Sequence, residues 1–169
     1  GSRLYVAGAF SKAAGAARYR LAGFDVETGT LISSFAPYFN ASVKTIAVSN
    51  TAIYAAGFFE VTRKSVSAPS SADDARHLVA AVSADGTRLP WEPDVRIVPI
   101  PNDPRVKNGV APTPSVTSLL LSPDGSKVLL GGSFNRLNGT KAQVGAVPSA
   151  GDGTSTLTFK VSTDLYYPN

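Results

Sequence analysis

The sequence predicts an all-β fold made of repeated units, and two observations support this prediction. The apolar segments are short, rich in Val, Ile, Leu, Tyr and Phe, and bounded by Gly, Asp, Asn and Pro, which is the pattern of β-strands separated by turns. The same order of strand and turn features also recurs along the chain, which indicates a repeat architecture. With 169 residues and a hydrophobic fraction of 43%, the chain is long enough to form a core and lies far from the composition of disordered proteins.

The repeat is clearest in a segment where three or four apolar residues lead to Gly, any residue and Phe. This segment occurs at 4–10, 53–59 and 128–134. A second apolar run follows each copy, at 21–24, 78–82 and 144–147. An aromatic residue then stands two positions before a proline in the first two copies, as Phe35 and Trp91. The segments 43–49 and 116–122 match each other and supply a further strand.

Several of these predicted strands are apolar throughout, so both of their faces are expected to be buried. Sheets stacked face to face around an axis, as in a β-propeller, provide that environment. We therefore predict a partial β-propeller of about two and three-quarter four-stranded antiparallel blades, with 43–49 and 116–122 innermost. The strands of the complete blade would be 43–49, 53–59, 77–83 and, outermost, about 87–94. The whole chain, 1–169, would be one partial propeller, divided into three strands of a first blade (4–37), a complete blade (43–94), an inter-blade insertion (95–115), a nearly complete third blade (116–161) and a tail (162–169).

The segment Gly131-Gly132-Ser133-Phe134-Asn135-Arg136-Leu137-Asn138-Gly139 carries a resemblance to a known repeat. With the Gly-containing turns and the aromatic-x-Pro motif, it resembles the delta-sixty type of bacterial β-propeller repeat, and less closely the kelch repeat. The first two copies depart from the pattern, because they have Ala-Gly in place of Gly-Gly. The resemblance implies a propeller fold and an extracellular or cell-surface location in a bacterium. It implies no catalytic residue, because the shared motif is structural and a fold does not fix a function.

The composition excludes several kinds of chemistry. The chain has no Cys, which rules out disulfides, thiolate metal sites and a Cys nucleophile. His77 is the only histidine, and no Ser or Asp stands around it at the spacing of a catalytic motif. Asp73 and Asp74 lack the alternating oxygen ligands of the calcium loops known from sequence. No apolar run approaches the roughly 20 residues of a membrane span. We therefore expect no enzymatic activity, no cofactor, no metal and no membrane span.

Two insertions distinguish the middle unit from the first, one between 59 and 78 and one between 93 and 116. Because alternate connections of an antiparallel meander lie at opposite ends, both insertions should emerge at the same end. Long connections are often functional. Ten basic residues should lie at that end: Lys12, Arg18, Arg63, Lys64, Arg76, Arg96, Arg105, Lys107, Arg136 and Lys141. Among these and their neighbours, the candidate ligand-binding residues are Arg96, Asn102, Arg105, Lys107, Asn108, Arg63, Lys64 and Arg76.

These observations favour a non-enzymatic propeller segment that acts as a scaffold or binding platform, with an acidic glycan or cell-wall polymer as the expected ligand. Two alternatives remain open at this point, a propeller enzyme whose catalytic residues lie in other blades, and a purely architectural segment of a larger assembly. The expected partners are the remaining blades, from a longer chain or another copy. Nucleic acid is not expected, because no interleaved aromatic and basic platform accompanies the charge.

Overall fold

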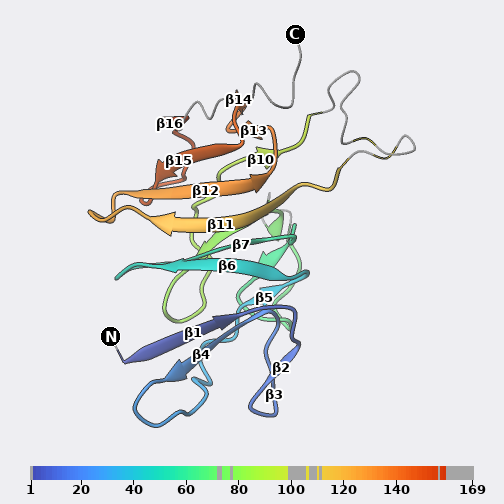
Figure 1. Ribbon diagram of the computed structural model, residues 1–169. Helices are drawn as coiled ribbons and strands as arrows, with labels where there is room; N and C mark the ends of the chain where they lie inside the picture. Colours follow the sequence, from blue (N-terminus) through green and yellow to red (C-terminus); the bar gives the residue numbers. More distant parts are fainter. Residues whose placement is uncertain are drawn as a thin grey trace.

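The computed structural model of the chain describes residues 2–71, 74–76, 78–98, 106, 110, 112–155 and 157–158. Within these residues the regular secondary structure consists of β-strands, with no α-helix. The prediction of an all-β fold is therefore confirmed. The longer strands form three antiparallel sheets, which lie one above another in Figure 1.

The three sheets follow the chain order. The first sheet pairs β1 (Arg3–Ala7) with β4 (Leu21–Asp25). The middle sheet contains β6 (Val43–Val48), β7 (Ile53–Gly57) and β9 (Val79–Val82), in that order. The third sheet has the order β11 (Ser115–Leu121), β12 (Lys127–Ser133), β15 (Val144–Pro148) and β16 (Leu157–Thr158). The middle sheet lies between the others, since β6 approaches both β1 and β11.

The connections fall into two groups at opposite ends of the strands (Figure 1). Tight turns around 50, 85, 124 and 151 lie at one end, here called the tight-turn end. Short strand pairs lie at the other end, here called the long-connection end. These pairs are β2 (Lys12–Ala13) with β3 (Ala16–Ala17), β5 (Tyr38–Phe39) with β8 (Thr62–Arg63), and β10 (Val95–Arg96) with β13 (Arg136–Leu137), which also pairs with β14 (Thr140–Lys141).

Two of the short pairs connect neighbouring sheets. β5 lies between the first and middle sheets in the chain and pairs with β8 of the middle unit, and β10 does the same with β13 of the third unit. Both insertions therefore leave their sheets at the long-connection end, which agrees with the expectation from the sequence.

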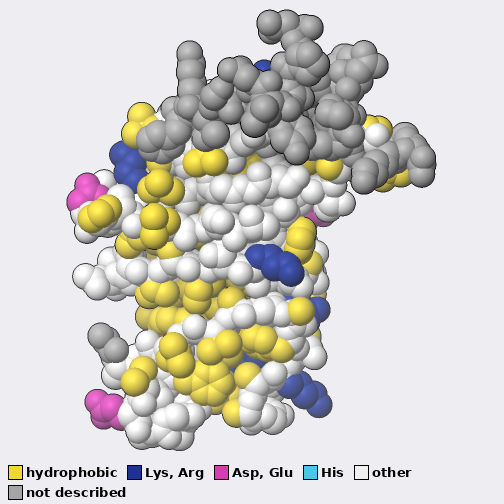
Figure 2. Space-filling view, in the orientation of Figure 1, with side chains coloured by type: hydrophobic (Ala, Val, Ile, Leu, Met, Phe, Trp, Pro, Cys, Tyr) yellow, Lys and Arg dark blue, Asp and Glu magenta, His cyan; other side chains and the backbone are white. Residues whose placement is uncertain are grey.

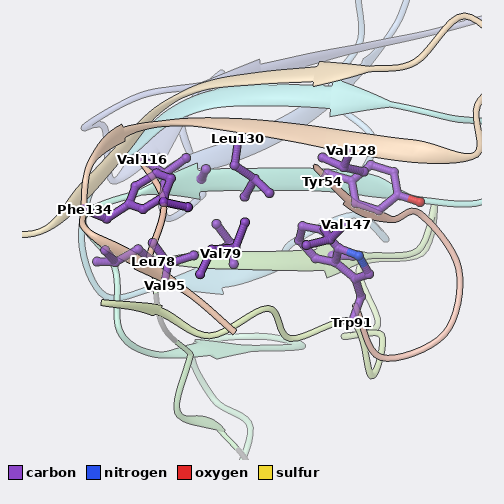
Figure 3. Close-up of a cluster of buried hydrophobic side chains, with 14 of the residues drawn as sticks. Tyr54, Leu78, Val79, Trp91, Val95, Val116, Val128, Leu130, Phe134 and Val147 are labelled. Carbon is purple, nitrogen blue, oxygen red and sulfur yellow. The ribbon is translucent and has the colours of Figure 1, made fainter. Parts of the chain in front are cut away.

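Two hydrophobic clusters hold the sheets together. One lies between the middle and third sheets and includes Tyr54, Trp91 and Leu130 (Figure 3). The other lies between the first and middle sheets and includes Leu21 and Phe35. Every residue of β7 and β9 is buried, because alternate side chains of these strands enter opposite clusters. This arrangement explains why the two segments are apolar without interruption.

The aromatic residue before each x-Pro belongs to the core. Trp91 packs edge-on against Tyr54, with ring centroids 5.0 Å apart, and Phe35 packs in the same way on Tyr5, also at 5.0 Å. Trp91 is 1% exposed and its Nε1 donates a hydrogen bond to the carbonyl oxygen of Pro148 in the third sheet, at 2.8 Å. Trp91 therefore links the middle sheet to the third sheet.

Some strands are shorter than the sequence indicates. The predicted strand 77–83 begins at Val79, because Leu78 has a φ of 71° and is not extended. The predicted strand 53–59 ends at Gly57, where the chain turns toward β8. The predicted outer strand 87–94 is present as a single bridge between Arg88 and Val82. Residues 159–161, assigned to the third unit, lie outside the described residues.

Candidate functional site

Three basic side chains lie next to one another at the long-connection end. Arg96 of β10 is directly opposite Arg136 of β13, and Arg136 is directly opposite Lys141 of β14. Side chains opposite each other on antiparallel strands share one face, with Cβ atoms about 4.5–5.5 Å apart. We call Arg96, Arg136 and Lys141 the basic row. Arg96 and Lys141 are exposed and Arg136 is half-buried.

The local sequence fixes the register of this row. Asn138 and Gly139 form the two-residue turn between β13 and β14, with φ values of 47° and 76°. Such a turn requires positive φ at both positions, which Asn and Gly tolerate. Because the turn is symmetric, Leu137 pairs with Thr140 and Arg136 with Lys141. The spacing of the two basic residues around Asn-Gly therefore places them together.

Two asparagine side chains hold β10 against β13. The Asp94 amide donates to Oδ1 of Asn138 at 2.8 Å, and the Asn138 amide donates to the carbonyl oxygen of Asp94 at 2.8 Å. Asn135 forms a similar pair with Val98, accepting from its amide at 2.8 Å and donating Nδ2 to its carbonyl at 2.7 Å. Arg96 lies between these two contacts, so its position opposite Arg136 is held from both sides.

Like charges placed directly opposite each other across a sheet are destabilising. The carboxylate of Asp94 pairs with Arg96 and offsets part of this repulsion. A bound anion would reduce the repulsion further. The arrangement is therefore able to bind a carboxylate, sulfate or phosphate group by charge-assisted hydrogen bonds.

The other basic candidates occupy a different place. Arg63 forms an ion pair with Asp74 at 2.9 Å, and Arg88 contacts the same carboxylate at 3.2 Å. Hydrogen bonding by the Ser71 amide, with help from these two cations, lowers the pKa of Asp74. Lys64 lies 3.7 Å from Asp85, which belongs to the tight-turn end. The 59–78 insertion thus begins at the long-connection end and then runs back along the outer edge of the middle sheet.

Arg76 and Arg18 are buried, with exposed fractions of 4% and 7%. Arg76 pairs with Glu92 at 3.3 Å. Arg18 donates to the carbonyl oxygens of Ala17, Ile32 and Ser33. These two arginines serve the packing of their own units, so neither contributes to an accessible basic surface. Asn102, Arg105, Lys107, Asn108, His77 and Asp73 lie outside the described residues.

The tight-turn end has the opposite charge. Asp25, Asp85, Asp124 and Asp152 lie in its turns, and each accepts hydrogen bonds from nearby residues. The Ser122 hydroxyl, together with the amide and hydroxyl of Ser126, lowers the pKa of Asp124 to about 2. The pKa values of the other three carboxyls are lowered by equivalent contacts. In the view of Figure 2, the acidic side chains lie mostly over this end and most basic ones toward the other.

No protein-family model, no curated protein and no solved structure matches the chain. In the part of the chain that the structure describes, no group of three or more His, Cys, Asp or Glu side chains could hold a metal ion. The same residues contain no helix long and apolar enough to cross a membrane. The basic row is the candidate site with the strongest support, because strand pairing brings its three residues together.

The basic row was only partly identified from the sequence. Arg96 was among the candidate residues, whereas Arg136 and Lys141 were counted at the long-connection end without being singled out. A signal for the pair existed in the sequence, because two basic residues flank the Asn138-Gly139 turn at equal distances. Their adjacency to Arg96 depends on a contact across 40 residues of chain, which periodicity does not reveal.

Proposed function

We propose that the chain is part of a β-propeller of a bacterial secreted or cell-surface protein, and that it acts as a non-enzymatic binding platform for an acidic glycan or cell-wall polymer. The observation that carries this proposal is the basic row, in which three basic residues occupy adjacent cross-strand positions at the end opposite the acidic turns. An acidic polymer would be attracted to that end and repelled from the other.

The propeller part of the proposal rests on the repeat. The strands that correspond in sequence have the same order in each sheet: β1-β4, β6-β7-β9 and β11-β12-β15. The aromatic pairs Tyr5 with Phe35 and Tyr54 with Trp91 also occupy equivalent positions in the first and middle units. The third unit adds an Asn-Gly hairpin, which resembles that of the delta-sixty type. Further blades of the same kind, from a longer chain or another copy, would extend the arrangement. The extracellular location is what the resemblance implies. The absence of Cys favours a bacterial over a eukaryotic secreted protein, because small secreted eukaryotic domains often carry disulfides.

Binding to a polyanion tests the function. The probe is polygalacturonate, a carboxylated glycan, with neutral dextran as the control ligand. The affinity of the wild-type chain should fall as salt is raised, because exposed charge pairs are screened. The double variant Arg136→Ala, Lys141→Ala should bind at least about tenfold more weakly, since each exposed contact contributes on the order of 1 kcal/mol.

A matched variant controls for net charge. Arg3→Ala with Lys127→Ala removes the same two charges, but from positions away from the basic row at the tight-turn end. Its affinity for polygalacturonate should stay close to that of the wild type. If both double variants lose affinity equally, the attraction comes from net charge and not from the row. If the wild type does not bind the polyanion at all, the architectural alternative is favoured.

A further inference from the structure

In the part of the chain that the structure describes, the strand β1 has a neighbour on one side only. In the middle and third sheets the equivalent strands, β7 and β12, each lie between two partners, β6 and β9 in one case and β11 and β15 in the other. Among the described residues, β1 pairs with β4 alone. Its other edge therefore corresponds to the edge that β6 and β11 occupy in the other two sheets.

A glycine occupies the equivalent sequence position in all three cases, as Gly8 directly after β1, Gly57 at the end of β7 and Gly132 near the end of β12. At Gly57 an added Cβ would lie 2.1 Å from the carbonyl oxygen of Ser42, and at Gly132 it would lie 2.3 Å from that of Ser115. Both contacts occur where the neighbouring strand is irregular, between Val43 and Thr45 and between Val116 and Ser118. Only glycine allows the neighbouring backbone to come so close.

Gly8 is the equivalent glycine of the first unit, and its surroundings are different. A Cβ at Gly8 would meet only the ring of Phe10, at 3.3 Å. Nothing in the described part of the chain requires glycine there, because the position does not have a positive φ either. Gly57 and Gly132 are needed because a neighbouring backbone lies close to them. Among the described residues no backbone lies as close to Gly8.

The two strands that make this approach share a sequence. Ser42-Val43-Lys44-Thr45-Ile46-Ala47-Val48-Ser49 and Ser115-Val116-Thr117-Ser118-Leu119-Leu120-Leu121-Ser122 agree in the pattern Ser-Val-x-Ser/Thr-Ile/Leu-x-Val/Leu-Ser. Each strand also precedes its partner in the chain through a tight turn. The neighbouring strand and the tight turn that joins it to its partner are therefore alike in the middle and third sheets.

We infer that the open edge of β1 is a docking site for an antiparallel strand of this pattern, joined ahead of residue 3 by a tight turn, with the carbonyl of its first serine lying over Gly8. The backbone groups on this edge of β1 would then be paired as they are in β7 and β12. The inference is independent of any glycan binding, because it concerns the tight packing of a strand edge and not the basic row.

The test adds the strand covalently. Residues 41–51 are placed ahead of Arg3 in the full chain, in place of Gly1 and Ser2, so that Leu4 follows the added strand as Ile53 follows β6. The melting temperature should rise by at least about 3 °C relative to the parent chain. The variant Gly8→Ala should abolish this rise, because its Cβ would meet the backbone of the added strand, while changing the melting temperature of the parent by less than about 1 °C.

Gly131→Ala is the matched control. A Cβ at Gly131 would meet only side-chain atoms at 3.8 and 3.9 Å, so this variant should leave the rise intact. An unchanged melting temperature on adding the strand would overturn the inference, as would a rise that persists in Gly8→Ala. Sedimentation of the parent chain supplies a further outcome. A dimer that becomes a monomer in Gly8→Ala would show that a second copy fills the edge, and would also overturn it.

Discussion

At the scale of single residues, two neighbouring glycines, Gly131 and Gly132, differ in whether they can accept a larger side chain. In the Gly131-Gly132 pair, only Gly132 lies against a backbone oxygen of the next strand. The first two units have Ala-Gly at the same place, which shows that the first position accepts a methyl group and the second keeps glycine. In the Gly131-Gly132 pair, therefore, only the second position requires glycine.

Alanine substitutions separate the two glycines. Gly132→Ala should lower the free energy of unfolding by about 2 kcal/mol or more, because the strand must move to relieve the backbone contact. Gly131→Ala should be neutral or stabilising by about 0.5 kcal/mol, since it restricts the unfolded chain without a clash. Urea denaturation of the two variants measures both values. Equal destabilisation would contradict this account of the motif.

The turn carboxylates make stability depend on pH. The pKa of Asp124 is held at about 2 by the hydroxyls and amide around it, below its value of about 3.9 in an unfolded chain. A carboxyl whose pKa is lower in the folded state adds stability above the unfolded pKa and loses it as the pH falls through the folded pKa. The advantage of the wild type over Asp124→Asn should thus be largest above pH 4 and shrink toward pH 2. Urea denaturation at several pH values checks this, and a constant difference would contradict it.

At the scale of elements, the hairpins at the long-connection end repeat one geometry with different residues. Ala14 and Gly15 occupy the turn of β2–β3, with φ values of 45° and 78°, where Asn138 and Gly139 occupy that of β13–β14. Asn138 also donates Nδ2 to the carbonyl oxygen of Gly153 at 2.8 Å. The third-unit hairpin is therefore fixed to its surroundings by contacts that an alanine cannot make.

Exchanging these turn residues should have opposite effects. Asn138→Ala should cost about 2 kcal/mol, because it places alanine at a positive φ and leaves the Asp94 amide without its side-chain acceptor. Ala14→Asn should stabilise by about 0.5–1 kcal/mol, since asparagine tolerates that conformation better. Thermal unfolding of both variants measures the effects. If Ala14→Asn is destabilising, the two turns are not equivalent.

Whether a strand could be predicted from the sequence depends on its length and on how far along the chain its pairing partner lies. The long strands at 43–48, 53–57 and 115–121 were predicted because burial on one or both faces leaves a local pattern. The two-residue strands β5, β8 and β10 were not, because they exist only through pairing with distant segments. The sequence could not predict the burial of Arg76 or the pairing of Arg63 with Asp74 for a similar reason, since both depend on contacts in the folded chain.

At the scale of the whole molecule, the described residues of the first and third sheets include apolar side chains that are exposed. Leu4 is 56% exposed and Val6 39%, whereas their equivalents in the middle sheet, Ile53 and Ala55, are 2% and 0% exposed. In the third sheet Leu120 is 64% and Leu157 55% exposed. Hydrophobic side chains gather over the first sheet in Figure 2. Exposed apolar surface of this kind marks a site of association.

The chain studied alone should therefore self-associate as its concentration rises. Leu4→Lys with Val6→Lys should reduce this association, because two charges would have to be desolvated at the contact. Sedimentation velocity over a range of concentrations measures the effect, and Val66→Lys, at an exposed position in the insertion, is the control. A wild-type chain that stays monomeric throughout would contradict the prediction.

The position of Trp91 provides an optical signal from one junction of the molecule. It is the only tryptophan of the chain, it lies 1% exposed between the middle and third sheets, and its indole is bonded to Pro148 of the third sheet. Its fluorescence therefore reports the separation of these two sheets, whereas the first sheet contains no such fluorophore. A denaturation curve followed by tryptophan emission and one followed by circular dichroism will coincide only if the first sheet unfolds together with the other two.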